Sequence, residues 1–141
     1  MNKTATHTVA EIMTTTPKTV TPDVSLEQLA NIFERVSYHH IPVVDNGKLV
    51  GIISDRDISV SMSPFLGTEA ERNMDRDLLQ KSANDIMTNQ VVCADEDTDL
   101  DTASILLLEN NFSCLPVTDA EDHLLGLLTW KDLLQYFVYA R

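Results

Sequence analysis

The sequence has few basic residues. Only 10 lysines and arginines stand against 22 aspartates and glutamates among its 141 residues, and the formal net charge is −12. Nucleic-acid backbones and anionic membrane surfaces are attracted by basic protein surfaces, so we expect neither as a partner. The excess of acidic over basic residues is larger in the second half of the chain. Residues 1–82 carry 8 bases and 11 acids, whereas residues 83–141 carry 2 bases and 11 acids. A polyphosphate ligand would prefer the first half.

Long apolar runs and cysteines are also scarce. No run approaches the ~18 apolar residues that a membrane-spanning helix needs, and the opening MNKTATHTVAEIM lacks the hydrophobic segment of a signal peptide. We therefore expect a cytoplasmic protein. In that compartment Cys93 and Cys114 are expected to be reduced and to act as small apolar residues, not as a disulfide. With 43% hydrophobic residues, the chain should fold without metal or disulfide support.

Three short motifs occur twice in the same order, which indicates an internal repeat. The first two return 74 positions later and the third returns 75 positions later, so one residue was added before the third motif of the second copy. The pairs are Ile12-Met13-Thr14 and Ile86-Met87-Thr88, Ile41-Pro42-Val43 and Leu115-Pro116-Val117, and Gly51, Ser54 and Asp57 with Gly126, Thr129 and Asp132.

Each repeat predicts the element order β-α-β-β-α after a short capped turn. The turns have Thr8 with Glu11 and Ser82 with Asp85 at capping spacing, and helices begin after Ser25 and after Asp99. The remaining strands are expected at 18–21 and 91–94 and in two hairpins, the first of which turns at Asn46-Gly47. A right-handed crossover should leave both helices of a unit on one face of its sheet.

These elements divide the chain into a first repeat, residues 8–61, a connector, residues 62–81, and a second repeat, residues 82–141. In the connector, Thr68 with Glu71 is expected to cap a further helix. The alternating charges Asp75-Arg76-Asp77 are expected on the exposed side of a helix, as solvated residues and not as a metal site.

The three doubled motifs resemble those of the tandem CBS domain pair, named after cystathionine β-synthase, over about residues 8–61 and 82–139. The resemblance implies an α+β fold in which two β-α-β-β-α units pack through their sheets with pseudo-two-fold symmetry. It also implies a regulatory module without enzymatic activity, whose clefts bind AMP, ADP, ATP or S-adenosylmethionine as a regulatory ligand. The layout is further similar to stand-alone CBS proteins linked to acetoin utilisation.

In that family pattern an aspartate holds the ribose hydroxyls and a serine or threonine helps to hold phosphate. The matching residues are Asp57 with Ser54 and Asp132 with Thr129. A carboxylate can accept hydrogen bonds from both ribose hydroxyls, and Arg56 and Lys131 can add positive charge at each helix start. The other expected binding residues are Thr19, Val20, Thr21, Val91, Val92 and Cys93 near adenine, and His39, His40, Ile41, Pro42, Ser113, Cys114, Leu115 and Pro116 around the two Pro-Val motifs.

Two other functions fit the sequence less well, and a third is a rival. A hydrolase triad of Ser54, His39 and an aspartate lacks the Gly-x-Ser-x-Gly turn, and the His39-His40 pair lacks further ligands at metal-binding spacing, so neither a catalytic nor a metal site is expected. The serious rival is a structural dimer that binds no nucleotide, because both aspartates also stand at capping spacing.

The final helix predicts assembly. Apolar residues recur on it with helical spacing, namely Trp130, Leu133, Leu134, Phe137 and Val138. Such a broad stripe predicts a homodimer whose interface includes this helix, as in CBS pairs that this chain resembles. Since no effector domain is recognised in the sequence, allosteric output would pass to a separate effector protein.

Overall fold

The computed structural model describes residues 7–139, which form two compact units. Within them, unit 1 comprises residues 7–17, 47–49 and 92–139, and unit 2 comprises 18–46 and 50–91. Each unit therefore includes the opening segment of the other sequence repeat. The last two residues of the second repeat expected from the sequence, 140–141, lie outside the described residues.

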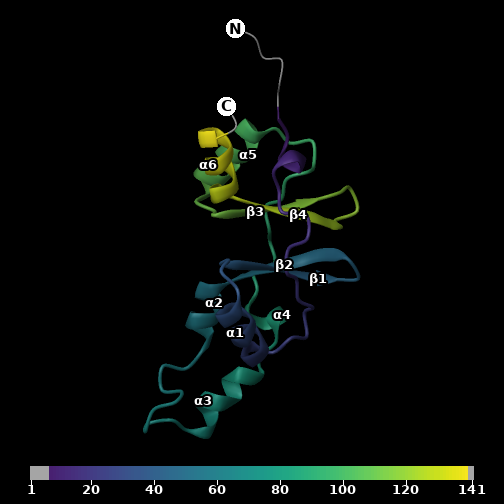
Figure 1. The fold of residues 1–141 in the computed structure, drawn as a ribbon. Coiled ribbons are helices and arrows are strands. Elements are labelled where there is room, and N and C mark those ends of the chain that lie inside the picture. The colour runs from purple at the N-terminus through teal and green to yellow at the C-terminus, as the bar shows by residue number, and fades with distance from the viewer. Residues whose placement is uncertain (1–6, 140–141) are drawn as a thin grey trace. The chain divides into compact units, whose positions relative to one another are not determined.

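Unit 2 places its helices on one face of a two-stranded hairpin (Figure 1). Its elements are α1 (Leu26–Arg35), β1 (His40–Asp45), most of β2 (Lys48–Ser54), α2 (Asp55–Ser61) and α4 (Ala83–Ile86). The tip of the hairpin, residues 47–49, belongs to unit 1. Helix α1 starts as predicted, because Ser25 Oγ accepts a hydrogen bond from the Gln28 N–H at 3.2 Å. The turn at Asn46 and Gly47 has φ of 53° and 81°, which is the left-handed geometry that an Asn-Gly hairpin turn requires.

Unit 1 repeats this arrangement with different residues (Figure 1). Its elements are the 3₁₀ turn η1 (Val9–Glu11), α5 (Leu100–Asn110), β3 (Cys114–Thr118), β4 (Leu124–Thr129) and α6 (Trp130–Tyr139). Strands β3 and β4 pair antiparallel, with Leu115 opposite Leu128, and both side chains lie in the core of the unit. Asp99 caps α5 by accepting the Thr102 N–H at 2.7 Å. No helix within residues 7–139 has the length and apolar character that crossing a bilayer requires.

We predicted strands at 18–21 and 91–94, and this prediction was wrong in length. Each segment has only one residue that pairs with a neighbouring strand. Val20 pairs parallel to Val43 and Ala94 pairs parallel to Val117. Val20 donates its N–H to the Pro42 carbonyl and accepts from the Val44 N–H, at 3.1 and 2.8 Å. Pro22, two residues later, has no N–H with which to continue the ladder.

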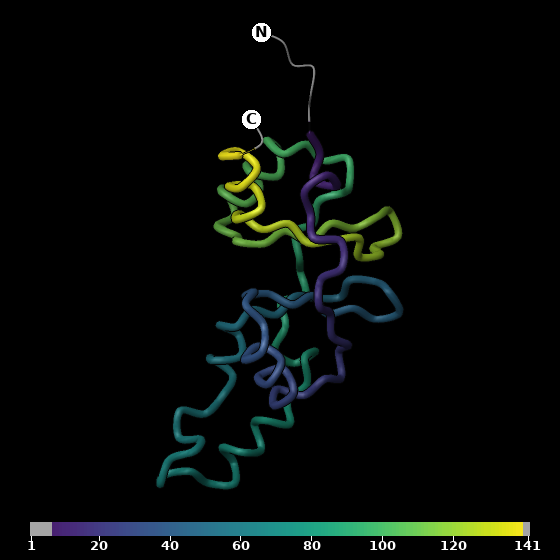
Figure 2. The backbone as a smooth tube through the Cα atoms, viewed as in Figure 1, coloured from purple at the N-terminus to yellow at the C-terminus, as the bar shows by residue number. Residues whose placement is uncertain are grey.

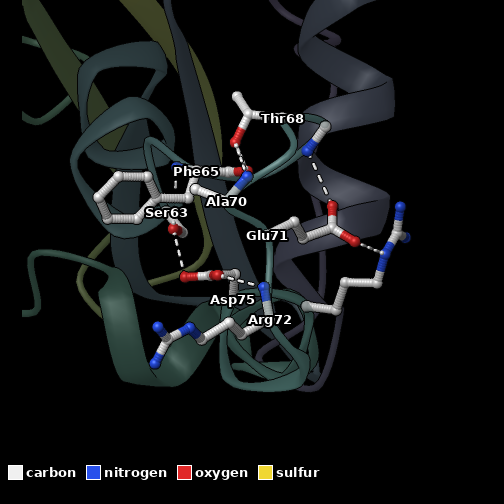
Figure 3. Close-up of polar contacts among 9 residues, drawn as sticks. Ser63, Phe65, Thr68, Ala70, Glu71, Arg72 and Asp75 are labelled. Carbon is white, nitrogen blue, oxygen red and sulfur yellow. Dashed lines mark hydrogen bonds and ion pairs between the residues drawn. The ribbon is translucent and has the colours of Figure 1, made fainter.

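The connector, in unit 2, contains the expected further helix, but this helix begins later than predicted and one of its charged residues is buried (Figure 3). The expected Thr68–Glu71 cap was wrong, since Glu71 accepts from the Gly67 N–H at 2.8 Å and from Arg76 Nε at 2.8 Å. Helix α3 (Asn73–Asp77) starts later and is followed by the 3₁₀ turn η2 (Leu78–Gln80). The tube in Figure 2 shows this teal segment extending away from the sheet of its unit.

Asp75 was expected to be solvated, but it is buried, with 8% of its surface exposed. Its carboxylate accepts hydrogen bonds from the Ser63 hydroxyl at 2.6 Å and from the Arg72 N–H at 2.7 Å (Figure 3). These hydrogen bonds lower the pKa of Asp75, because they stabilise its charged form. The carboxylate therefore ties the two ends of the loop together.

The doubled glycines have a packing role. A Cβ on Gly51 would lie 2.3 Å from Met87 Sδ and 3.0 Å from the Thr88 carbonyl oxygen. A Cβ on Gly126 would lie 2.6 Å from Met13 Sδ and 2.7 Å from the Thr14 carbonyl oxygen. In each unit, therefore, the Met-Thr segment of one repeat packs on the glycine strand of the other repeat, which accounts for two of the three doubled motifs.

We expect Gly51→Ala to lower the free energy of unfolding by roughly 1–3 kcal/mol, because the methyl group overpacks this contact. Its closest neighbour is the flexible Met87 side chain, so adding Met87→Ala should recover part of the loss in a double-mutant cycle measured by urea unfolding. Gly126→Ala with Met13→Ala is the matched comparison. In that pair the recovery of stability should be smaller, because a Cβ on Gly126 would also lie only 2.7 Å from the Thr14 carbonyl oxygen. Equal stability of Gly51→Ala and wild type would contradict the packing role.

Candidate functional site

In unit 2 the first candidate residues meet at the start of α2. The Ser54 N–H donates to Asp57 Oδ2 at 2.8 Å, and the Asp57 N–H donates to Ser54 Oγ at 3.1 Å. The two residues thus form a reciprocal capping box, which the sequence allowed as the alternative interpretation. The cap uses one carboxylate oxygen. The other, Asp57 Oδ1, takes no part in this box.

The histidine pair lies beside this carboxylate. The Asp55 N–H donates to the His39 carbonyl at 3.0 Å, which holds the start of β1 against the start of α2. His39 Nδ1 is also 2.7 Å from Asp55 Oδ2, and both side chains are exposed. His40 is partly buried, and burial lowers its pKa, while the negative charges of Asp55 and Asp57 act in the opposite direction.

The remaining candidates of unit 2 lie along the neighbouring backbone. Val20 pairs beside β1, and Thr19 and Thr21 on either side of it are exposed. The Thr21 hydroxyl donates to the Asp23 carboxylate, and this hydrogen bond lowers the pKa of Asp23. Ile41 and Pro42 are buried, so their side chains contribute to the core, whereas Arg56 is exposed at the start of α2.

Unit 1 contains the same arrangement at the start of α6. The Thr129 N–H donates to Asp132 Oδ2 at 2.9 Å, and the Asp132 N–H donates to Thr129 Oγ1 at 3.2 Å. The Trp130 N–H donates to the Ser113 carbonyl at 3.2 Å, as Asp55 does to His39 in unit 2. Lys131 is exposed beside them. The repeat in the sequence is therefore also a repeat of backbone hydrogen bonds.

Cys114 takes the place of His40 in unit 1. It pairs with Thr129 across the β3–β4 ladder and is buried. Burial, assisted by the negative charge of Asp132, raises the pKa of its thiol to about 12. Cys93 is partly buried, and burial raises the pKa of this thiol as well. Both cysteines are free, as predicted.

The residue of unit 1 that corresponds to Val20 is Ala94. It donates to the Pro116 carbonyl and accepts from the Thr118 N–H, both at 2.9 Å. The predicted residues Val91 and Val92 come before this contact, and only Cys93 adjoins it. Leu115 and Pro116 are buried within β3.

Sequence reasoning missed two residues at these helix starts, Asp55 and Trp130. Each begins the final helix of its repeat and follows the doubled serine or threonine directly, which was the available signal. The sequence also gave no prediction for Asp119, Glu121 and His123, whose potential ligand atoms lie within 4.8 Å of one another. Asp119 already accepts the N–H groups of Glu121 and His123, both at 2.9 Å, so these residues close the β3–β4 loop.

Comparison with known proteins settles the family. The family model of the CBS domain matches residues 9–63 and 83–139. The chain belongs to the CBS domain family. A CBS domain-containing protein of Dictyostelium discoideum is 32% identical over 132 residues, which are 92% of this chain and 90% of that protein. The chain is also 36% identical, over 118 residues, to an inosine-5'-monophosphate dehydrogenase of Methanocaldococcus jannaschii. That match covers 83% of this chain but only 21% of the enzyme, so the chain spans about a fifth of its length.

Solved CBS structures share the fold over nearly the whole chain. A CBS domain pair in complex with 5'-methylthioadenosine and S-adenosyl-L-methionine has a TM-score of 0.78 at 28% identity, covering 97% of this chain and 100% of that one. The structure of CBSX2 in complex with AMP has a TM-score of 0.80 at 28% identity, with coverage of 95% and 98%. The AcuB protein of Vibrio cholerae shares the fold at 24% identity, with a TM-score of 0.80 and coverage of 96% and 93%. The predicted α+β CBS pair is therefore confirmed.

We expect the two thiols to differ in reactivity toward iodoacetamide at pH 8. With a pKa of about 12, Cys114 is almost entirely a neutral thiol at this pH. It should react about 1,000-fold more slowly than an unperturbed cysteine, because the thiolate is the nucleophile. Peptide mass spectrometry over time should show Cys93 modified before Cys114 and both modified at similar rates in denaturant. Equal rates in the folded protein would contradict the burial of Cys114.

Proposed function

We propose that the protein is a regulatory module that binds an adenosine-containing ligand, such as AMP, ADP, ATP or S-adenosylmethionine, at the starts of α2 and α6. The observation that carries this proposal is the doubled arrangement of hydroxyl and carboxylate. In each unit the cap engages Oδ2 of the aspartate through a backbone N–H, at 2.8 Å for Asp57 and 2.9 Å for Asp132. The cap fixes the orientation of the carboxylate, and its second oxygen can accept from ribose hydroxyls. Solved relatives that hold AMP or S-adenosyl-L-methionine support the ligand class.

The residues around each carboxylate support recognition of the whole ligand. In unit 2, Arg56 is exposed next to Asp57, and in unit 1, Lys131 is exposed next to Asp132. The backbone at Thr19–Thr21 and the start of β1 supply the expected adenine-binding surface in unit 2. For unit 1 we propose that Val92, Cys93 and the Ser113–Pro116 segment contribute in the same way, and that Val91, the last residue of unit 2, contributes backbone beside them.

A regulatory role fits better than a catalytic one. The inosine-5'-monophosphate dehydrogenase matches this chain over only about a fifth of its own length, so its activity is not carried over. We propose that a separate effector protein reads the ligand state and that neither nucleic acid nor a membrane is a partner. The free thiols Cys93 and Cys114 are consistent with the reducing environment of the cytoplasm.

A homodimer forms part of the proposal. Helix α6 leaves Leu134, Phe137 and Val138 exposed, and Ile105 and Leu108 on α5 are exposed as well. Helices α5 and α6 pack on each other, and large apolar side chains exposed on two such neighbouring helices favour an interaction surface. Two-fold pairing is the commonest form of assembly. A ligand at the start of α6 would then act on the same helix that takes part in the interface, which gives an allosteric route to a partner.

Thermal unfolding with AMP, ATP, S-adenosylmethionine and 5'-methylthioadenosine tests ligand binding. A ligand at ~100 times its dissociation constant stabilises the folded state by about 2.7 kcal/mol. For a chain of this size, the midpoint should rise by roughly 5–10 °C. If no compound moves the midpoint beyond experimental scatter, the structural-dimer alternative is favoured.

Asp57→Asn separates the capping role of Asp57 from ligand binding. The asparagine Oδ1 can still accept the Ser54 N–H, but the amide presents donors where ribose hydroxyls need an acceptor. Calorimetry should show about 10- to 100-fold weaker binding at the unit 2 site, because a hydrogen bond to a charged group is lost, with little change in stability. Asp132→Asn is the matched variant for unit 1. A large loss of stability with unchanged affinity would identify Asp57 as a structural cap alone.

Light scattering at micromolar concentration should return twice the chain mass of 15.8 kDa. Leu134→Glu should shift the mass toward the monomer, since it places a charge on the exposed face of α6. Val60→Glu is the control, because Val60 is also exposed but lies on α2 in unit 2. A mass of one chain for the wild type, with and without nucleotide, would rule out the homodimer.

A further inference from the structure

Each unit places a methionine sulfur where the side chain of its doubled glycine would be. A Cβ on Gly51 would overlap Met87 Sδ, and a Cβ on Gly126 would lie 2.6 Å from Met13 Sδ. Both methionines are partly buried and pack against the core of their own unit. Each therefore fills a closely defined space on the glycine strand while part of its surface stays in contact with solvent.

The residue after each methionine joins the same strand by backbone hydrogen bonds. Ile52 and Thr88 exchange two of them, at 2.9 and 3.0 Å, and Thr14 and Leu127 exchange two at 2.9 Å. These bonds connect the Met-Thr segment of one repeat to the glycine strand of the other repeat within each unit. A change in the methionine side chain acts directly on this junction.

The methionine thioether is open to oxidation at neutral pH, whereas the cysteine thiols are protected. Burial raises the pKa of Cys114 to about 12 and also raises the pKa of Cys93, so little of the reactive thiolate forms. A thioether carries no proton on sulfur and needs no ionisation. Its sulfur forms a bond to one oxygen of a hydroperoxide as the O–O bond breaks, and with hydrogen peroxide the other oxygen leaves as water. The sulfur loses two electrons, the peroxide gains two, and the product is methionine sulfoxide.

We propose that Met13 and Met87 are oxidative modification sites through which a hydroperoxide loosens each unit. A sulfoxide oxygen cannot face the glycine strand, because the sulfur already occupies the space of a Cβ there. Turned away from the strand, the polar oxygen needs a hydration that a partly buried position supplies poorly. Either placement draws the methionine away from the glycine and strains the two hydrogen bonds beside it. This inference does not depend on the proposed ligand.

The modification has a reverse reaction. Methionine sulfoxide reductases return a sulfoxide to the thioether, one enzyme acting on each epimer at sulfur. Since oxidation and reduction act on the same atom, the junction can be loosened and restored without unfolding the chain. The two motif methionines thus give the fold a redox-sensitive contact in each unit.

The chain also contains methionines that serve as internal comparisons. Met74 on α3 is 67% exposed, so it should be oxidised first and without consequence for stability. Met62 is partly buried and packs against the core of unit 2. Its oxidation has to be separated from that of Met87, which packs on the same core.

Timed treatment of the full chain with hydrogen peroxide at pH 7 tests the proposal. Peptide mass spectrometry follows each methionine, thermal unfolding follows stability, and nuclear magnetic resonance follows hydrogen exchange of the Thr88 and Leu127 amides. The midpoint should fall by roughly 5 °C as Met13 and Met87 become sulfoxides, after Met74 is already oxidised. Exchange of both amides should accelerate over the same period. Incubation with the reductases for both epimers should restore the midpoint and slow the exchange again.

Two double variants identify the methionines responsible. Met13→Leu with Met87→Leu keeps the side-chain volumes nearly constant, and peroxide should then leave its midpoint unchanged. Met62→Leu with Met74→Leu is the matched control, which keeps both motif methionines and should lose as much stability as the wild type. If the first variant does not fold, the amide exchange of the wild type during oxidation decides the question.

Three results would overturn the inference. The first is that Met13 and Met87 remain thioethers in the folded protein after Met74 is fully oxidised. The second is that both become sulfoxides while the midpoint and the amide exchange stay unchanged. The third is that the Met62→Leu, Met74→Leu variant resists peroxide, which would assign the loss of stability to those residues. The proposed function would stand in all three cases.

Discussion

Each unit depends on the close approach of a methionine-threonine segment to a glycine in a strand. Met87 and Thr88 lie where a side chain on Gly51 would be, and Met13 and Thr14 lie in the same way against Gly126. The antiparallel bridges Ile52–Thr88 and Thr14–Leu127 can form only if this space is empty. Because the approaching segment comes from the other repeat, neither repeat contains all the strands of its own unit. The two halves of the sequence must therefore fold in dependence on each other.

Under the proposed function, the capping box at each helix start would serve a second purpose. A capping box at a helix start satisfies backbone N–H groups that would otherwise lack partners. Here the box also fixes the orientation of an aspartate through one of its carboxylate oxygens, Oδ2, and the second oxygen takes no part in the box. The hydrogen bond from the helix start to the carbonyl before the hairpin, 3.0 Å in unit 2 and 3.2 Å in unit 1, adds rigidity to the same region. A ligand site built on such fixed groups loses little entropy on binding.

The two units have diverged around this common frame. Unit 2 has a histidine pair, exposed arginine and two aspartates at the start of α2, whereas unit 1 has a buried thiol and an exposed indole at the start of α6. The apolar residues left exposed on α5 and α6 have few counterparts on α1 and α2, where Val60 is the main exception. The connector in turn is held by Asp75, whose burial requires the hydrogen bonds of Ser63 and Arg72. Divergence of this kind is expected when one copy of a duplicated unit takes on a separate task.

The sequence by itself determined the features that depend on neighbouring residues. The helix caps at Ser25 and Asp99 and the Asn46-Gly47 turn were predictable, because hydrogen bonds over three residues and left-handed backbone angles follow from local residue types. The doubled hydroxyl and aspartate were found in the same way. Tertiary structure alone decided which Met-Thr segment packs on which glycine, and that Ala94 is the residue of its segment that pairs with a strand. It also decided that Asp75 is buried and that Asp55 contacts His39, 16 positions away in the sequence. These features depend on contacts between distant parts of the chain, whose geometry local spacing does not encode.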